Sequence, residues 1–155
     1  MSEADRVSIL WARPSDAAEL AQLHGQLFAP PWSIASFEQS LTHPAYTALV
    51  ARVGRPLQLV GFIIGQQAAD EAEILTLGVR KDWQRRGVGR DLVLALGRAA
   101  RKAEARRLHL EVASDNAAAL ALYQGLGFEI SGQRIGYYER AGAAAEDAIC
   151  CSLFL

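Results

Sequence analysis

Two glycines in a basic stretch give the clearest chemical signal in this sequence. Gly87 and Gly89 precede a segment of helical spacing, so backbone N–H groups at the start of that helix can converge on one anion. Arg85, Arg86 and Arg90 add positive charge at the same place, and the helix dipole reinforces it. The pattern predicts a binding site for a pyrophosphate group.

The same loop allows three other interpretations. Its glycines could simply shape a turn among solvated arginines. A dinucleotide-binding loop would use Gly87-Val88-Gly89 with Glu111 about twenty residues on, but Leu92 occupies the place of the third glycine and the loop is too long. A nucleotide-triphosphate loop would need a following Gly-Lys-Ser/Thr, which this sequence lacks. The two nucleotide-binding interpretations are therefore disfavoured, and a pyrophosphate cradle is preferred to a plain turn, which stays open as the alternative.

Strand and helix patterns alternate around this loop. Apolar alternation and turn residues predict strands at residues 7–11, 46–53, 57–67, 73–79, 107–112, 128–138 and 147–154. Caps and helical spacing predict helices from Asp16 to about Phe28, from Ser33 to Leu41, through Leu92 to Ala103, and from Asn116 to the stop at Gly127. We expect one α/β domain spanning residues 1–155.

The composition excludes several classes of function. Of the 155 residues, 51% are hydrophobic and 21% are charged, and the formal net charge is −1. This balance fits an ordinary globular domain and provides no global field for nucleic acid or an anionic membrane. The first residues lack the basic and then apolar pattern of a signal peptide. No apolar run approaches the length of a membrane-spanning helix, so we expect a cytoplasmic protein.

Neither the cysteines nor the histidines predict a metal site. Cys150 and Cys151 are adjacent in an apolar segment, and neighbouring side chains on a strand point to opposite faces, so we expect small hydrophobic residues there. His24, His43 and His109 share no ligand spacing and are expected at the surface or as satisfied core residues.

Two segments resemble a known family. Gln84-Arg85-Arg86-Gly87-Val88-Gly89 matches the Gln/Arg-x-x-Gly-x-Gly/Ala signature of the GNAT acetyltransferases, and residues 110–128 resemble the second half of the RimI-type N-terminal alanine acetyltransferases of bacterial ribosomes. The resemblance implies the GNAT (acyl-CoA N-acyltransferase) fold, a mixed sheet of about seven strands flanked by about four helices. It implies acetyl-CoA as cosubstrate, no metal, and cofactor contacts from Leu77, Gly78, Val79, Arg85, Arg86, Gly87, Val88, Gly89, Arg90, Asn116 and Tyr123.

By the same resemblance, Glu111 is the catalytic base and Tyr123 the catalytic acid. An α-ammonium group has a pKa near 7.7–8.0, and a carboxylate can accept its proton directly or through a water. A phenol can protonate the departing thiolate of coenzyme A. Taken alone, Glu111 could equally be a solvated residue and Tyr123 a packing residue. Gly78 is expected to ease close approach of the pantetheine arm where two strands splay apart.

The acceptor side is expected to involve four aromatic residues, Phe28, Trp32, Tyr137 and Tyr138. With the resemblance, they indicate acetylation of a protein N-terminal α-amine, the alanine of a small-subunit ribosomal protein, by direct attack of the amine on the thioester. Thr76 and Glu139 stand where the RimI-type pattern has Asn and Pro, which leaves the acceptor open.

Two alternative functions remain on the sequence alone. The first is acetylation of a small amine such as an antibiotic or polyamine, because one fold serves many acceptors. The second is a non-catalytic acyl-CoA-binding or interaction module, although such a module would need neither Glu111 nor Tyr123. The sequence leaves the oligomeric state and any need for a partner protein open.

Overall fold

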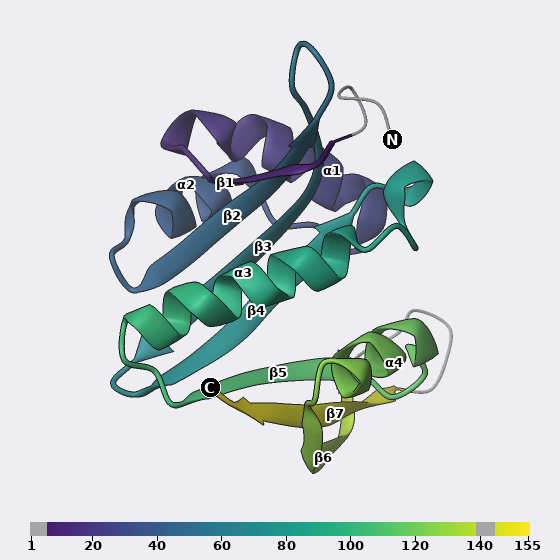
Figure 1. The fold of residues 1–155 in the computed structure, drawn as a ribbon. Coiled ribbons are helices and arrows are strands. Elements are labelled where there is room, and N and C mark those ends of the chain that lie inside the picture. The colour runs from purple at the N-terminus through teal and green to yellow at the C-terminus, as the bar shows by residue number, and fades with distance from the viewer. Residues whose placement is uncertain (1–5, 139–144) are drawn as a thin grey trace.

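Seven strands form one mixed sheet, drawn in Figure 1 from the computed structural model. The structure describes residues 6–138 and 145–155, so the start of the chain and Glu139 lie outside it. The strand order is β1-β2-β3-β4-β5-β7-β6. β4 and β5 pair in parallel and every other pair in the described sheet is antiparallel.

The elements follow the predicted segments closely and confirm the expected fold. The strands are β1 Ser8–Trp11, β2 Tyr46–Val53, β3 Gln58–Ala68, β4 Glu71–Val79, β5 Arg107–Ala113, β6 Glu129–Tyr138 and β7 Glu146–Phe154. The α-helices are α1 Ala17–Leu27, α2 Ile34–Thr42, α3 Val88–Lys102 and α4 Ala117–Gly125. Ser33 caps α2, and Gly127 takes the left-handed conformation after α4 with φ +97°.

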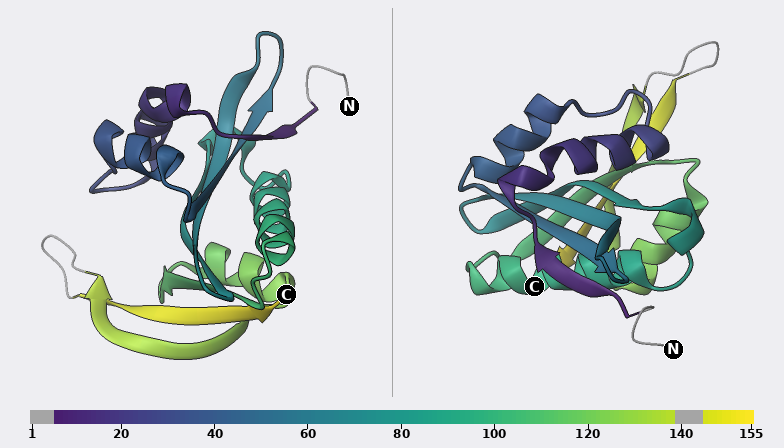
Figure 2. Two further views of the ribbon diagram at one scale, coloured as in Figure 1. Left: turned by 90° about the vertical axis from the view of Figure 1, so that its left-hand side faces the viewer. Right: turned by 90° about the horizontal axis from the view of Figure 1, so that it is seen from above.

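Helices cover both faces of the sheet, with α1 and α2 on one side and α3 on the other (Figure 2). The apolar stripe of α3 keeps helical spacing and buries Leu92, Leu96 and Ala100 in a core that also contains β5 and Tyr123. On the opposite face, Leu20 of α1 and Phe37 of α2 pack against β2 and β3 in a second core. Alternate residues of the strands supply the two cores.

The sheet opens between β4 and β5. Their pairing is confined to residues 71–73 of β4 and 107–109 of β5, whereas β5 pairs with β7 on its other edge along its whole length. β4 also carries a bulge, because Ile64 pairs with Thr76 while Gly65 pairs with Ile74, leaving Leu75 as the extra residue. The predicted splay is therefore present, and an irregular stretch of β4 faces it.

No helix in the described part of the chain is long and apolar enough to cross a membrane. Cys151 is buried and Cys150 is half-buried, in agreement with the prediction that the two side chains point to opposite faces.

Candidate active site

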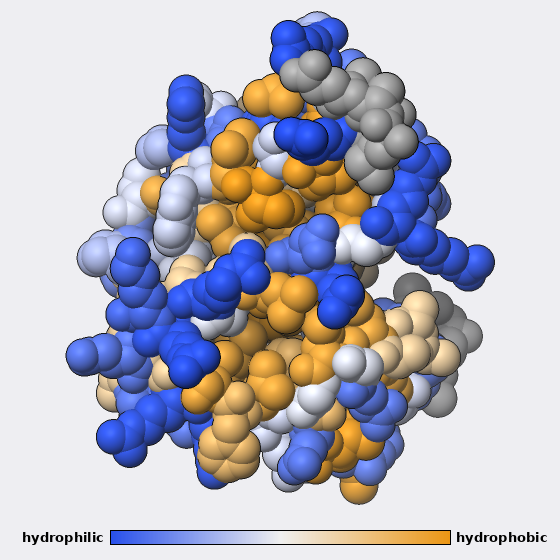
Figure 3. Space-filling model, viewed as in Figure 1, coloured by the Kyte–Doolittle hydropathy of each residue, from blue (hydrophilic) through white to orange (hydrophobic). Residues whose placement is uncertain are grey.

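The glycine loop leads directly into the N-terminus of α3. Gly87 precedes the first helical residue with φ +86°, and a Cβ at this position would meet no atom within 4 Å. The first N–H groups of a helix have no partner within it, so those of Val88 and Gly89 are available to an anion. The loop lies at an edge of the molecule from which hydrophilic side chains project in Figure 3. This geometry suits the predicted phosphate site.

Two side chains of the loop have partners within the protein. Arg86 stacks over Trp83 at 4.6 Å, and Gln84 Nε2 donates to the carbonyl oxygen of Val79 at 2.9 Å, so both hold the loop in shape. Val88 is 2% exposed, which leaves only its backbone for a cofactor contact. Gly89 approaches Leu122 and thereby brings the loop beside α4.

The glycine of β4 has a different neighbour from the one expected. A Cβ at Gly78 would lie 2.5 Å from Cζ of Phe62 and 2.9 Å from Cδ1 of Leu27, both side chains of the α1 and α2 face. Such a contact is too short for any other residue type, so Gly78 makes room for a protein ring. Leu77 lines the cleft described next, whereas Gly78 and Val79 are not among its described lining residues.

A cleft of about 480 Å³ lies in the gap between β4 and β5. Its walls are His24 of α1 and the segment after this helix, residues 74–77 of β4, residues 110–113 of β5, Asn116 with residues along α4, and Tyr138 at the end of β6. The structure thus brings together seven of the predicted site residues, namely Phe28, Trp32, Leu77, Glu111, Asn116, Tyr123 and Tyr138.

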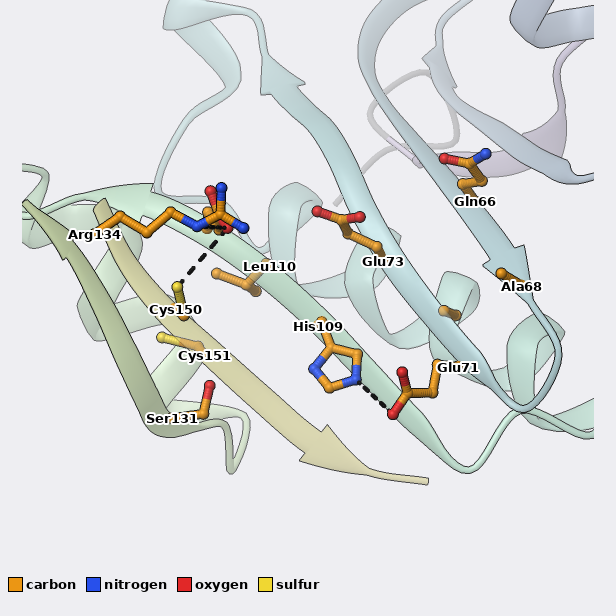
Figure 4. Close-up of a pocket in the computed structure, with 12 residues that line it drawn as sticks. Gln66, Ala68, Glu71, Glu73, His109, Leu110, Ser131, Arg134, Cys150 and Cys151 are labelled. Atoms are coloured by element: carbon orange, nitrogen blue, oxygen red, sulfur yellow. Dashed lines mark hydrogen bonds and ion pairs between the residues drawn. The ribbon is translucent and has the colours of Figure 1, made fainter. Parts of the chain in front are cut away.

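Glu111 is held in place at the cleft by an ion pair. Its Oε1 lies 3.0 Å from Nε of Arg134 on β6, and the glutamate side chain is 19% exposed. Cys150 Sγ lies 3.8 Å from the same oxygen (Figure 4). Arg134 and Cys150 are therefore neighbours of the predicted base that the sequence did not single out as site residues.

Tyr123 lies on α4 and is buried against Phe128, with ring centroids 5.5 Å apart. Burial raises the pKa of its phenol to about 12, with smaller contributions from Cys151 and Tyr138. Both hypotheses for this residue have support, because it packs in the core and also lines the cleft.

Asn116 has a structural role in addition to its predicted contact with the cofactor. Its Oδ1 accepts a hydrogen bond from the N–H of Ala119 at 3.2 Å and so caps α4. The amide NH₂ group is the part of the side chain that could serve a cofactor, because the oxygen is already engaged.

The two tyrosines differ in position. Tyr138 lines the cleft, and burial raises the pKa of its phenol. Tyr137 is 49% exposed, does not contribute to the described lining of the cleft, and lies under the guanidinium of Arg134 at 5.1 Å. The prediction that both form the acceptor wall therefore fits Tyr138 directly and Tyr137 only through Arg134.

A second groove, of about 450 Å³, adjoins the cleft and shares Leu110 and Glu111 with it. Figure 4 shows it between β4 and the C-terminal strands, with Glu71, Glu73 and His109 along its length. His109 Nε2 lies 3.5 Å from Glu71, an ion pair only when the imidazole is charged. Among the described residues, no cluster of three or more His, Cys, Asp or Glu side chains is arranged to hold a metal ion.

Known proteins match this chain over most of its length. Residues 17–128 match the Acetyltransferase (GNAT) family. The N-alpha-acetyltransferase RimI of Mycobacterium tuberculosis is 37% identical over 150 residues, covering 93% of this chain and 92% of that protein. The crystal structure of the ribosomal-protein-S18-alanine N-acetyltransferase from Escherichia coli has a TM-score of 0.87 at 31% identity, covering 96% of this chain and 94% of that one. NAA60 of Arabidopsis thaliana in complex with acetyl-CoA shares the fold, with a TM-score of 0.86 at 20% identity over 97% of this chain and 99% of that one.

Proposed function

The chain belongs to the GNAT acetyltransferase family, and we propose that this N-acetyltransferase moves the acetyl group of acetyl-CoA onto the α-amine of a protein N-terminus. The proposed acceptor is the N-terminal alanine of a small-subunit ribosomal protein, the substrate class named for the similar Escherichia coli enzyme. The observation that carries the proposal is the cleft itself, where Glu111, Tyr123 and the aromatic segment after α1 meet in the gap of the sheet. We further propose that residues 1–155 form a single domain, since strands from both ends of the chain share one sheet.

The loop ahead of α3 fits the pyrophosphate of acetyl-CoA. The open space over Gly87, the free N–H groups at the helix start and the nearby arginines together suit a doubly charged anion. We assign Gly87, Val88 and Gly89 to it through their backbones, and Arg85 and Arg90 through their charges. Acetyl-CoA supplies the thioester carbonyl that a neutral amine can attack directly.

Glu111 is proposed as the base that accepts the proton of the acceptor ammonium. An α-amine with a pKa near 7.8 is neutral in roughly one molecule in seven at pH 7, so a base raises the reactive fraction. The carboxylate has the required position at the cleft, and its contact with Arg134 fixes its orientation.

Tyr123 is proposed as the hydrogen-bond donor to the departing sulfur. With a pKa of about 12 its phenol stays protonated across neutral pH, so a proton is always available. Complete transfer to a thiolate of ordinary pKa 8.5 would be uphill by about 3.5 units, or about 5 kcal/mol. Donation of a hydrogen bond in the transition state therefore suits this side chain better than full ionisation.

The test measures thiol release from acetyl-CoA with three acceptors. These are a short peptide beginning with Ala, the same peptide blocked at its N-terminus, and a polyamine. We expect turnover of the free peptide only. Turnover confined to the polyamine would replace the proposal by the small-amine function, and tight acetyl-CoA binding without turnover would contradict both.

The matched variants are Glu111→Gln and Glu73→Gln. Both remove one carboxylate, but Glu73 lines only the neighbouring groove. At pH 7 the Glu111 variant should lose about 10²-fold to 10³-fold in kcat, the usual contribution of a general base, while the Glu73 variant keeps kcat within about threefold. The loss of kcat in Glu111→Gln should become smaller above pH 8, where most of the acceptor amine is already neutral. Equal losses in both variants would remove Glu111 from its proposed role.

A further inference from the structure

His24 lies beneath the aromatic wall of the cleft. This residue of α1 is 3% exposed and contributes to the lining of the cleft. Four aromatic rings surround its imidazole, with centroid distances of 4.5 Å to Phe28, 5.5 Å to Trp32, 5.6 Å to Phe37 and 5.8 Å to Phe62. It is a core histidine with hydrogen-bond partners, one of the two outcomes predicted for it. These partners, Trp32 and Thr76, belong to opposite walls of the cleft.

Both ring nitrogens of His24 have a partner. Nδ1 accepts the backbone N–H of Trp32 at 3.1 Å, and Nε2 lies 3.3 Å from Oγ1 of Thr76. A backbone N–H can only donate, so Nδ1 must carry no proton and Nε2 must carry one, which it donates to Thr76. Trp32 belongs to the segment between α1 and α2, and Thr76 follows the bulge of β4. The neutral imidazole thus ties the aromatic segment to the irregular part of β4.

We propose that His24 is a positioning residue for the acceptor, which holds the aromatic segment at residues 28–32 against β4 only while its imidazole is neutral. The inference rests on the proposed function, because an acceptor peptide that reaches Glu111 in the cleft would meet this segment, which lines the cleft with Phe28 and Trp32. Protonation would place a second donor on Nδ1, facing the N–H of Trp32, and the bond that anchors the segment would be lost.

The surroundings of His24 favour the neutral form. The side chains that face it from the neighbouring elements are Phe28, Trp32, Phe37, Phe62 and Thr76, and none of these ionises. Among the titratable groups, Glu111, Tyr123 and Tyr138 line the same cleft from β5, α4 and β6. Burial lowers the pKa of His24 below its ordinary value of 6.5.

The direction of the pH effect follows from that shift. The anchored state is complete above pH 6.5, and it is lost as the pH falls through the lowered pKa of the folded protein. The unfolded chain takes up the proton first, so the protein also loses stability as the pH falls below 6.5. Weaker acceptor binding and lower stability should therefore appear on the acid side.

The first experiment is steady-state kinetics with acetyl-CoA and the Ala-starting peptide, between pH 5 and 8. His24→Phe keeps an aromatic ring and removes both bonds, so its KM for the peptide should rise about tenfold at pH 7.5, as for loss of a buried hydrogen bond. Its KM for acetyl-CoA should stay within twofold. His24→Asn keeps a carbonyl oxygen near Nδ1 but cannot ionise, so its peptide KM should stay closer to that of the wild type and lose the rise below pH 6.5 that is specific to His24.

The second experiment is independent of activity. In ¹⁵N NMR spectra of the whole protein, His24, assigned by comparison with His24→Asn, should show Nδ1 unprotonated and Nε2 protonated at pH 7.5. Its titration and the shift of the Trp32 amide should share one midpoint below 6.5. Thr76→Val serves as a second variant, which removes the Nε2 partner, leaves His24 in place, and should also raise the peptide KM.

Three results would each overturn the inference. They are the opposite tautomer of His24, an unchanged peptide KM in His24→Phe, and a peptide KM of His24→Asn that rises below pH 6.5 as much as that of the wild type. Failure of the proposed function has a different signature, since wild-type protein would then not turn over the peptide at any pH. The two outcomes can therefore be told apart in one set of measurements.

Discussion

Gly78 offers the sharpest test of how β4 is built. The resemblance led us to expect that its missing side chain lets a cofactor approach, whereas in the structure the ring of Phe62 occupies that space. An added Cβ would lie 2.5 Å from Cζ and 2.7 Å from Cε1 of this ring, which is 0% exposed, so the surrounding core would have to shift. Gly78→Ala should therefore destabilise the protein.

The expected magnitude follows from two opposing terms. Overpacking of a core typically lowers the free energy of unfolding by about 1–3 kcal/mol. Replacing Gly by Ala restricts the unfolded chain, which raises the free energy of unfolding by about 0.4–1 kcal/mol. The difference spans about 0–2.6 kcal/mol and centres on a net loss of about 1.3 kcal/mol, or roughly 3–5 °C in Tm for a chain of this size. Urea unfolding measures it, and the m-value should be unchanged.

Two controls isolate the cause. Gly97→Ala adds a Cβ on α3 that meets only Leu155 at 3.7 Å, so the gain in helix propensity should stabilise the protein by up to about 1 kcal/mol. Phe62→Leu removes the clashing ring atoms, and the double variant with Gly78→Ala should lose less stability than the sum of the single ones. A Gly78→Ala protein as stable as the wild type, with a tenfold higher KM for acetyl-CoA, would refute this explanation and restore the cofactor as the reason for the glycine.

Three further predictions follow from single contacts. Tyr123→Phe should lower kcat by about 10²-fold without changing the shape of the pH–rate profile between pH 6 and 9, because a phenol with a pKa of about 12 does not titrate there. Gly87→Leu should raise the Kd for coenzyme A in calorimetry and destabilise the loop by about 1–2 kcal/mol, because φ is +86°. Arg52→Met should cost about 1.5–3 kcal/mol at pH 7 in urea unfolding, since the guanidinium lies 3.0 Å from Oδ1 of Asp16 and 2.8 Å from Oε1 of Glu19.

Local signals in the sequence predicted most of the fold. The cap Ser33 accepts a hydrogen bond from the N–H of Ser36 at 3.1 Å, and Asn116 caps α4 in the same way. The buried and half-buried residues of β5 alternate as its sequence does. These features depend on neighbours a few residues apart, so one sequence contains the information.

Features set by distant contacts escaped prediction. The extra residue Leu75 shifts the alternation of β4, and no local pattern in the sequence marks the bulge. The partners of His24 illustrate the same limit, because Thr76 is 52 residues away. A usable signal did exist, since His24 and Phe28 are one helical turn apart at the end of α1, just before an aromatic segment.

The position of the cleft explains why both halves of the chain are needed for a site. β4 brings the bulge and, through His24, the aromatic segment after α1. β5 brings Glu111, which Arg134 of β6 orients from across β7. Because β5 pairs with β4 over three residues only, while it pairs with β7 along its other edge throughout, these two sets face each other across a gap instead of closing into a continuous sheet. A change that extended the pairing of β4 with β5 would therefore abolish the site while improving the sheet, so the open gap in the sheet is what function requires of this fold.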